Sequence, residues 1–177
     1  MRFKWWVLLW VFVSGVVQAA GYSGSGDTTG AALWNRPVED YTDLSLIGTD
    51  VPYAVLAFQV DTAGSYSFNA SAGYDNFTFL YQGSFSAADP LQHVIAANDD
   101  NGGLGASGFD ASLLAGVDYY FIHTGFENTD AGIYQLTING AGNVLVAASP
   151  VPAPAVVWLF ATGLPLMAAV IRRRRQA

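Results

Sequence analysis

The chain has 177 residues, no cysteine and a formal net charge of −7 at pH 7. This length allows one domain with a single hydrophobic core. Without cysteine the chain has no disulfide framework, no thiolate nucleophile and no cysteine-ligated zinc site.

The charges are distributed unevenly. All 14 acidic residues lie between Asp27 and Asp130, and that part holds one basic residue, Arg36, which gives it a formal charge of −13. Such an acidic part repels phosphate groups, which excludes nucleic acid and anionic lipid as its partners. It is suited to cations, and two interpretations stay open: solubility and metal binding.

Residues 1–19 have the three parts of a secretory signal peptide. Arg2 and Lys4 form a basic start, residues 5–13 are uninterrupted apolar sequence, and Val17 and Ala19 stand at −3 and −1 of a cleavage site. The sequence therefore predicts export by the secretion translocase and removal of residues 1–19 by signal peptidase. An uncleaved anchor helix is the alternative.

The C-terminal end has the features of a membrane anchor. Residues 155–171 carry no charge and would form a helix of roughly 25 Å, which is a thin membrane span. A cationic cluster follows at once and would hold that end on the cytoplasmic face of the inner membrane: Arg172, Arg173, Arg174 and Arg175. The predicted main domain then lies outside that membrane.

A proline motif precedes this span and consists of Val151, Pro152, Ala153 and Pro154. Its two prolines hold the chain extended, as a protease requires. Together, residues 151–175 resemble a PEP-CTERM sorting signal, with Ala153 where the family name has Glu. The resemblance implies a Gram-negative bacterium that makes exopolysaccharide, cleavage by an exosortase, and delivery to the cell surface or medium. A plain single-pass anchor is the alternative.

The middle of the chain is predicted to be all-β. Short alternating apolar runs separated by turn residues predict strands at 53–60, 65–69, 77–81, 93–97, 109–113, 119–124 and 133–138. We expect a small antiparallel β-sandwich of about 7–9 strands, jelly-roll-like, over residues 35–143, with its aromatic residues on the inner faces of two sheets. A signal helix and a transmembrane helix would flank it. The Gly-rich segment 20–34 is predicted to be a flexible lead-in, and residues 144–150 a linker.

The order of these segments, with Phe58 to Val60, the Asn98 to Gly102 turn and the pair Tyr119 and Tyr120, resembles the bacterial pre-peptidase C-terminal domain over about 90 residues. That resemblance implies an auxiliary, non-catalytic binding or solubilising module, which holds calcium in some members.

A candidate calcium site lies in the same turn. Calcium takes six to eight oxygen ligands, and consecutive oxygen-bearing side chains followed by glycines supply such a set. The residues are Asn98, Asp99, Asp100 and Asn101, joined by Asp75 and Asp110 if the neighbouring loops converge. The alternative is an Asx-rich turn whose side chains cap their own backbone.

No catalytic motif is present. The only histidines, His93 and His123, each lie in a strand-like segment, and the sequence has no Gly-x-Ser-x-Gly, His-Glu-x-x-His or phosphate-binding glycine motif. We therefore expect no enzyme but an exported surface or matrix protein whose acidic sandwich binds exopolysaccharide or decorates the envelope. Two alternatives stay open: a calcium-stabilised ligand-binding or adhesive module, and a secreted hydrolase with an unrecognised site.

Overall fold

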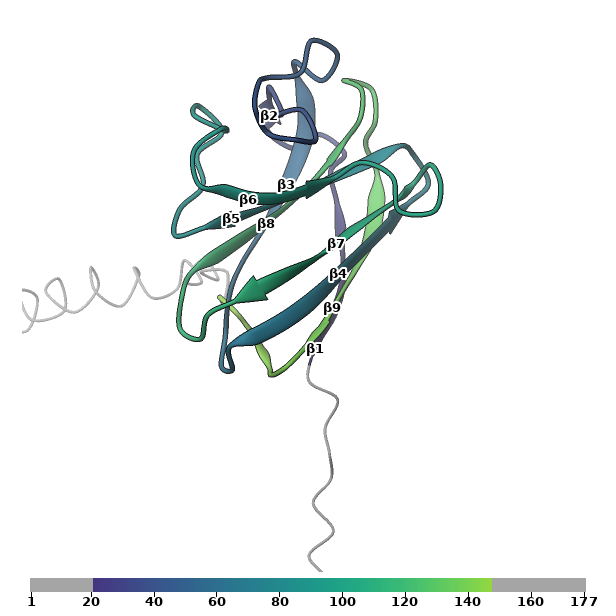
Figure 1. Ribbon diagram of the computed structural model, residues 1–177. Coiled ribbons are helices and arrows are strands. Elements are labelled where there is room, and N and C mark those ends of the chain that lie inside the picture. Colours follow the sequence, from purple (N-terminus) through teal and green to yellow (C-terminus); the bar gives the residue numbers. More distant parts are fainter. Residues whose placement is uncertain (1–20, 148–177) are drawn as a thin grey trace, which may run out of the picture. The chain divides into compact units, whose positions relative to one another are not determined.

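The computed structural model describes residues 21–147, which form ten strands and no helix (Figure 1). The strands are β1 (Gly21–Asp27), β2 (Leu33–Trp34), β3 (Val51–Val60), β4 (Gly64–Ala72), β5 (Asn76–Gln82), β6 (Val94–Asn98), β7 (Ala106–Leu113), β8 (Tyr119–Gly125), β9 (Ile133–Gly140) and β10 (Val144–Val146). In these residues no helix is long and apolar enough to cross a membrane. The predicted signal peptide, membrane span and sorting motif lie outside the described residues.

The strands form two antiparallel sheets that face each other (Figure 1). The first sheet has the order β1-β9-β4-β7, and the second has the order β10-β3-β8-β5-β6, with β2 paired to β3. When the short strands β2 and β10 are set aside, the other eight have the strand order of a jelly roll: consecutive strands change sheet except β5 and β6, which pair in the second sheet. The all-β antiparallel prediction is therefore confirmed, with ten strands instead of 7–9.

The main core lies between the sheets. Phe68 of β4 stacks on Phe121 of β8, with ring centroids 5.8 Å apart and planes 6° apart. Alternation along β4 places Phe68 in this core, while its neighbours Ser67 and Asn69 face the other side of the sheet. Burying these rings removes apolar surface from water and supplies the main driving force for folding.

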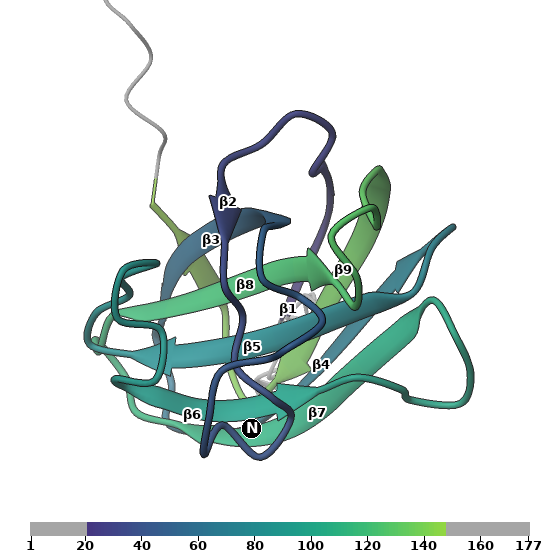
Figure 2. The ribbon, with the colours of Figure 1, turned by 90° about the horizontal axis from the view of Figure 1, so that it is seen from above.

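A second core covers the outer face of the second sheet. Phe77, Phe79 and Tyr81 of β5 point away from the first sheet and pack with Trp34 beneath the segments 35–50 and 83–93. Figure 2 shows the segment after β2 crossing over β8 and β5. The prediction that the aromatic residues line only the two inner faces is therefore wrong for β5. Both faces of this central strand are covered, so alternation alone does not tell which one meets the other sheet.

The prediction of a flexible lead-in at 20–34 is also wrong. β1 pairs with β9 along its whole length, from Gly21 opposite Asn139 to Asp27 opposite Ile133. A Cβ at Gly26 would overlap the ring of Tyr134, so this glycine makes room for packing. At the other end of the domain, Val144–Val146 of the predicted linker form β10 on the edge of the second sheet.

Candidate functional site: an acidic pocket under the segment 35–50

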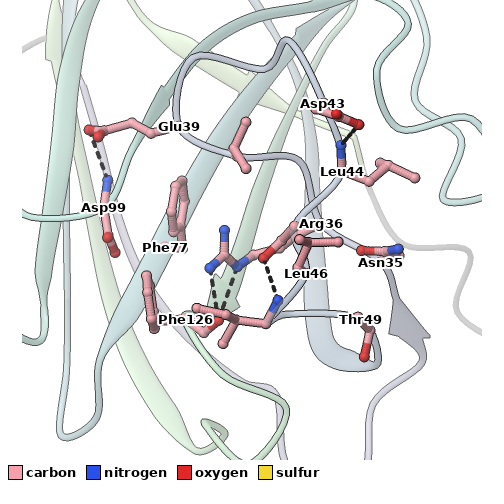
Figure 3. A pocket seen from close by; sticks show the side chains of 13 residues that line it. Asn35, Arg36, Glu39, Asp43, Leu44, Leu46, Thr49, Phe77, Asp99 and Phe126 are labelled. Carbon is pink, nitrogen blue, oxygen red and sulfur yellow. Dashed lines mark hydrogen bonds between the residues drawn. The ribbon is translucent and has the colours of Figure 1, made fainter.

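The segment 35–50, which joins β2 to β3, forms one wall of an open cavity of about 680 Å³ (Figure 3). The cavity is lined by exposed or half-buried carboxylates, aliphatic side chains, two rings at its base, and the polar residues Asn35, Arg36, Ser45 and Thr49. The carboxylates are Glu39, Asp43 and Asp99, the aliphatic residues are Val38, Leu44, Leu46 and Ile47, and the rings are Phe77 and Phe126. We call this cavity the acidic pocket.

Arg36 fixes the segment to the second sheet. Its side chain is 2% exposed, and its guanidinium carbon lies 4.4 Å from the ring centroid of Phe77 and 4.8 Å from that of Phe126. Nε and Nη2 donate to the carbonyl oxygen of Phe126 at 3.1 and 2.9 Å, and Nη1 donates to that of Pro37 at 3.0 Å. Burial lowers the pKa of Arg36. Because the ordinary pKa of an arginine is so high, its guanidinium still stays protonated. The guanidinium therefore anchors the segment 35–50 through hydrogen bonds to the backbone carbonyls of Phe126 and Pro37, and we call this set of contacts the Arg36 brace.

The same segment is closed by its own hydrogen bonds. The hydroxyl of Ser45 accepts from the backbone N–H groups of Ile47 and Gly48, at 3.1 and 3.0 Å. The N–H of Arg36 donates to the carbonyl of Gly48 at 3.1 Å, so the turn folds back on its start. A Cβ at Gly48 would overlap the Arg36 side chain, which explains the glycine. The pocket wall is thus held in one shape.

The negative charges of the carboxylates in and next to the pocket are poorly balanced by positive charge or hydrogen bonds. Burial, followed by the charges of Asp75 and Asp100, raises the pKa of Asp99 to about 6. Burial also raises the pKa of Asp75, with Asp100 as the next cause. In the described part of the chain, Oδ1 of Asp75 and Oδ1 of Asp99 are buried without a hydrogen-bond partner. The site therefore has negative charge that a cation would relieve.

The aliphatic wall is unusually open to solvent. Leu46 is 96% exposed and Ile47 is 52% exposed, although both belong to a segment that is fixed at its base. On the rim, Glu39 accepts hydrogen bonds through Oε1 from the N–H of Asp99 at 3.4 Å and from Nδ2 of Asn98 at 3.2 Å. The pocket therefore presents apolar surface and negative charge side by side.

The predicted calcium ligands are only partly brought together. Asp75, Asp99 and Asp100 are within electrostatic range of one another. The amide of Asn98 is engaged elsewhere, because its Oδ1 accepts from the N–H of Gly108 at 2.8 Å. The N–H of Asn101 closes the β6–β7 turn by donating to the carbonyl of Ala106 at 2.7 Å, and exposed Asp110 lies on β7. Within residues 21–147 no three acidic or histidine side chains are grouped as a metal site. Calcium binding by this set stays a prediction.

The two histidines lie apart from the pocket. His93 is exposed in the turn before β6 and has a positive φ of 67°. His123 is fully buried between the sheets, where it stacks on Tyr134 at 3.8 Å and its Nε2 lies 3.1 Å from the hydroxyl of Tyr74. Burial lowers the pKa of His123 to about 3, so its ring is neutral. His123 is therefore a packed core residue, and His93 is a turn residue at the surface.

Sequence reasoning missed both the pocket and its brace. The segment 35–50 has no regular periodicity, so it gives no strand or helix signal. One signal was available: Arg36 is the only basic residue among the 14 acidic ones between Asp27 and Asp130. A lone cation in such a setting indicates a buried structural contact or a binding group.

The described residues define an all-β, two-sheet sandwich with an acidic and partly aliphatic pocket. No family model and no curated protein matches the chain. Among solved structures it is similar to the pre-peptidase C-terminal domain of collagenase from Bacillus anthracis, at 17% identity and a TM-score of 0.43, over 68% of this chain and 90% of that one. It is also similar to PliG, a periplasmic lysozyme inhibitor of g-type lysozyme from Aeromonas hydrophila, at 14% identity and a TM-score of 0.40, over 73% and 93%. Neither similarity carries an activity over to this chain.

Proposed function

We propose that this chain is an exported, non-catalytic protein of the cell surface or extracellular matrix, and that its sandwich is a ligand-binding module. The acidic pocket is the observation that carries the proposal. The Arg36 brace fixes the segment 35–50, and yet Leu46 and the carboxylates of this segment remain open to solvent. Concave sites that combine apolar walls with a few polar groups are typical of ligand binding.

Delivery to the surface is the second half of the proposal. Residues 1–19 would direct export, and the span 155–171 with the arginines after it would hold the precursor in the inner membrane. An exosortase would then cut near Val151–Pro154 and release the sandwich to the surface, where exopolysaccharide surrounds it.

Fractionation of a tagged chain tests this delivery. The tag belongs at Gly102 or Gly103, which are exposed in the β6–β7 turn, because the N-terminal strand β1 is paired. In a host with its exosortase we expect a shortened form at the surface or in the medium. In a host without it we expect the longer form in the inner membrane.

A pair of variants sharpens that experiment. Replacing Pro152 and Pro154 by alanine should cause the same accumulation as loss of the exosortase, because the motif is no longer held extended. Pro165→Ala, which changes a proline inside the span, is the matched control and should be processed. Identical fractions with and without the exosortase would show a plain anchor and overturn the sorting proposal.

A further inference from the structure

We propose that the acidic pocket binds a basic segment of a partner protein, with the stem of an arginine or lysine against Leu46 and Ile47 and its charge on the rim carboxylate of Asp43, near that of Glu39. The proposal rests on the proposed function and names the ligand class of its site. The partner is defined by this chemistry: an extended peptide that carries a cationic side chain next to aliphatic ones.

Charge is the first argument. The part of the chain from Asp27 to Asp130 has a formal charge of −13, and its single cation, Arg36, is buried and bonded to carbonyl oxygens. The surface near the pocket is therefore anionic without a compensating surface cation in that part. A field of this kind attracts a cationic partner and speeds its encounter.

The aliphatic wall is the second argument. A bare metal ion or a small inorganic cation gains nothing from Leu46, which is 96% exposed, or from Ile47. Lysine and arginine side chains combine an apolar stem with a charged end, and they cover apolar surface while keeping that end at a polar partner. Figure 3 shows Leu46 beside Arg36, and Glu39 and Asp43 farther from both.

The free oxygens on the rim favour a side chain that donates hydrogen bonds. Asp43 uses Oδ1 to accept from the N–H of Leu44 at 2.8 Å, and Glu39 uses Oε1 for Asn98 and Asp99. Within residues 21–147, Oδ2 of Asp43 and Oε2 of Glu39 accept no hydrogen bond. Each can take a charge-assisted hydrogen bond, and the guanidinium fork of arginine fits such groups best.

The rings at the base argue against a sugar as the ligand. Phe77 is 1% exposed, and the Arg36 guanidinium covers the rings of Phe77 and Phe126 at 4.4 and 4.8 Å. The ring of Phe77 is therefore closed to a sugar, and Arg36 covers one face of the partly buried ring of Phe126. Aliphatic walls with carboxylates above them fit a peptide side chain better.

Fluorescence anisotropy tests the proposal with the full-length chain in a non-ionic detergent. The probe is a dye-labelled peptide, glycine-flanked Leu-Arg-Leu, and the matched control peptide has glutamine in place of arginine. We expect the arginine peptide to bind about tenfold more tightly, a preference that weakens as salt is raised. Oligomers of glucosamine, titrated in parallel, report on a cationic sugar.

Three variants locate the contact. Asp43→Asn and Leu46→Ser should each weaken binding of the arginine peptide by about threefold or more. Asp110→Asn removes the same charge from an exposed position on β7 in the first sheet, and it should leave the affinity within about a factor of two. Melting temperatures within about two degrees of the parent confirm that each variant is folded.

Several outcomes would overturn the proposal. If Asp43→Asn and Asp110→Asn weakened peptide binding equally, the binding would be general charge attraction. If Leu46→Ser left the affinity unchanged, the aliphatic wall would not contact the peptide. Tighter binding of oligoglucosamine, or no binding of the peptide up to about 5 mM, would also end it. Each of these results leaves the exosortase fractionation untouched, so the two proposals fail separately.

Discussion

Arg36 and Phe126 are 90 residues apart in the sequence, and two nitrogens of one guanidinium donate to one carbonyl oxygen, at 3.1 and 2.9 Å. This contact ties the segment before β3 to the end of β8. The pocket wall lies between Arg36 and β3, so the guanidinium fixes its start to the second sheet, while the Ser45 hydroxyl and the Gly48 carbonyl hold its internal turn.

Replacing Arg36 by methionine should therefore destabilise the domain. The change keeps an apolar stem of similar width but leaves the carbonyl of Phe126 without its donor, at a cost of about 2 kcal/mol. Urea denaturation measures the loss. Faster proteolysis or hydrogen exchange in residues 35–50 would show that the wall has opened. Glu127→Gln, at an exposed neighbour of Phe126, is the control, and a methionine variant as stable as the parent would contradict the role of the brace.

Gly26→Ala tests whether β1 belongs to the sandwich. A Cβ at this position would overlap the ring of Tyr134, and such overpacking costs about 1–3 kcal/mol. Ser25→Ala is the matched control, because Ser25 is exposed on the other face of the same strand. Thermal unfolding of the two variants gives the comparison. Equal melting temperatures would mean that the segment is not packed in solution.

The strands were predictable where aromatic and β-branched residues are concentrated. The runs at 53–60, 119–124 and 133–138 match β3, β8 and β9 closely, because these residue types favour strands. β1 was missed because glycine and serine are usually typical of flexible segments. In this fold, glycine at position 26 is required by the bulk of Tyr134, a residue more than a hundred positions away.

The candidate site was much less predictable. The Asn98–Asn101 turn attracted attention through its composition, but its closure depends on contacts with Gly108 and Ala106 in the next strand. The sequence singles out Arg36 only as the one basic residue in an acidic part of the chain. Its contact with Phe126 depends on the fold and could not be predicted. Side chains that act across distant segments leave no local pattern in a single sequence.

His123 should make stability depend on pH. Burial lowers its pKa to about 3 in the folded protein, against an ordinary value of 6.5. Between these values the unfolded chain binds a proton that the folded one does not. The contribution of His123 to stability is therefore complete above pH 6.5 and falls on acidification, by up to roughly 1.4 kcal/mol per pH unit. His123→Gln removes this slope. Parallel curves of unfolding free energy for parent and variant, from about pH 6 to about pH 4, would contradict the prediction.

The ionisation of Asp99 should change stability with pH in the opposite direction to that of His123. Burial first, and then Asp75 and Asp100, raise its pKa to about 6 from an ordinary 3.8. The folded protein therefore prefers the protonated carboxyl, and ionised Asp99 lowers stability above pH 6; this penalty fades as the pH falls toward 3.8. Asp99→Asn should stabilise the domain at neutral pH by no more than about 1 kcal/mol, because solvent screens a partly exposed group.

Thermal melts across the pH range check this expectation for Asp99→Asn. The gain over the parent should shrink steadily on acidification and vanish near the ordinary pKa of the carboxyl. Asp110→Asn, at an exposed position on β7 away from Asp99, is the control. A gain that stays constant with pH would show that removal of the charge is not its source.

The pairing of β1 with β9 has a consequence for the timing of biogenesis. The first strand of the domain finds its hydrogen-bonding partner only when Ile133–Gly140 is available, so the four-stranded sheet is completed late. Such long-range pairing is slow compared with local structure formation. If the chain is exported as proposed, an early folded domain would not obstruct it, and the sandwich would close only after almost all of it had crossed the membrane. An anchor placed after β10 would retain the chain for that interval.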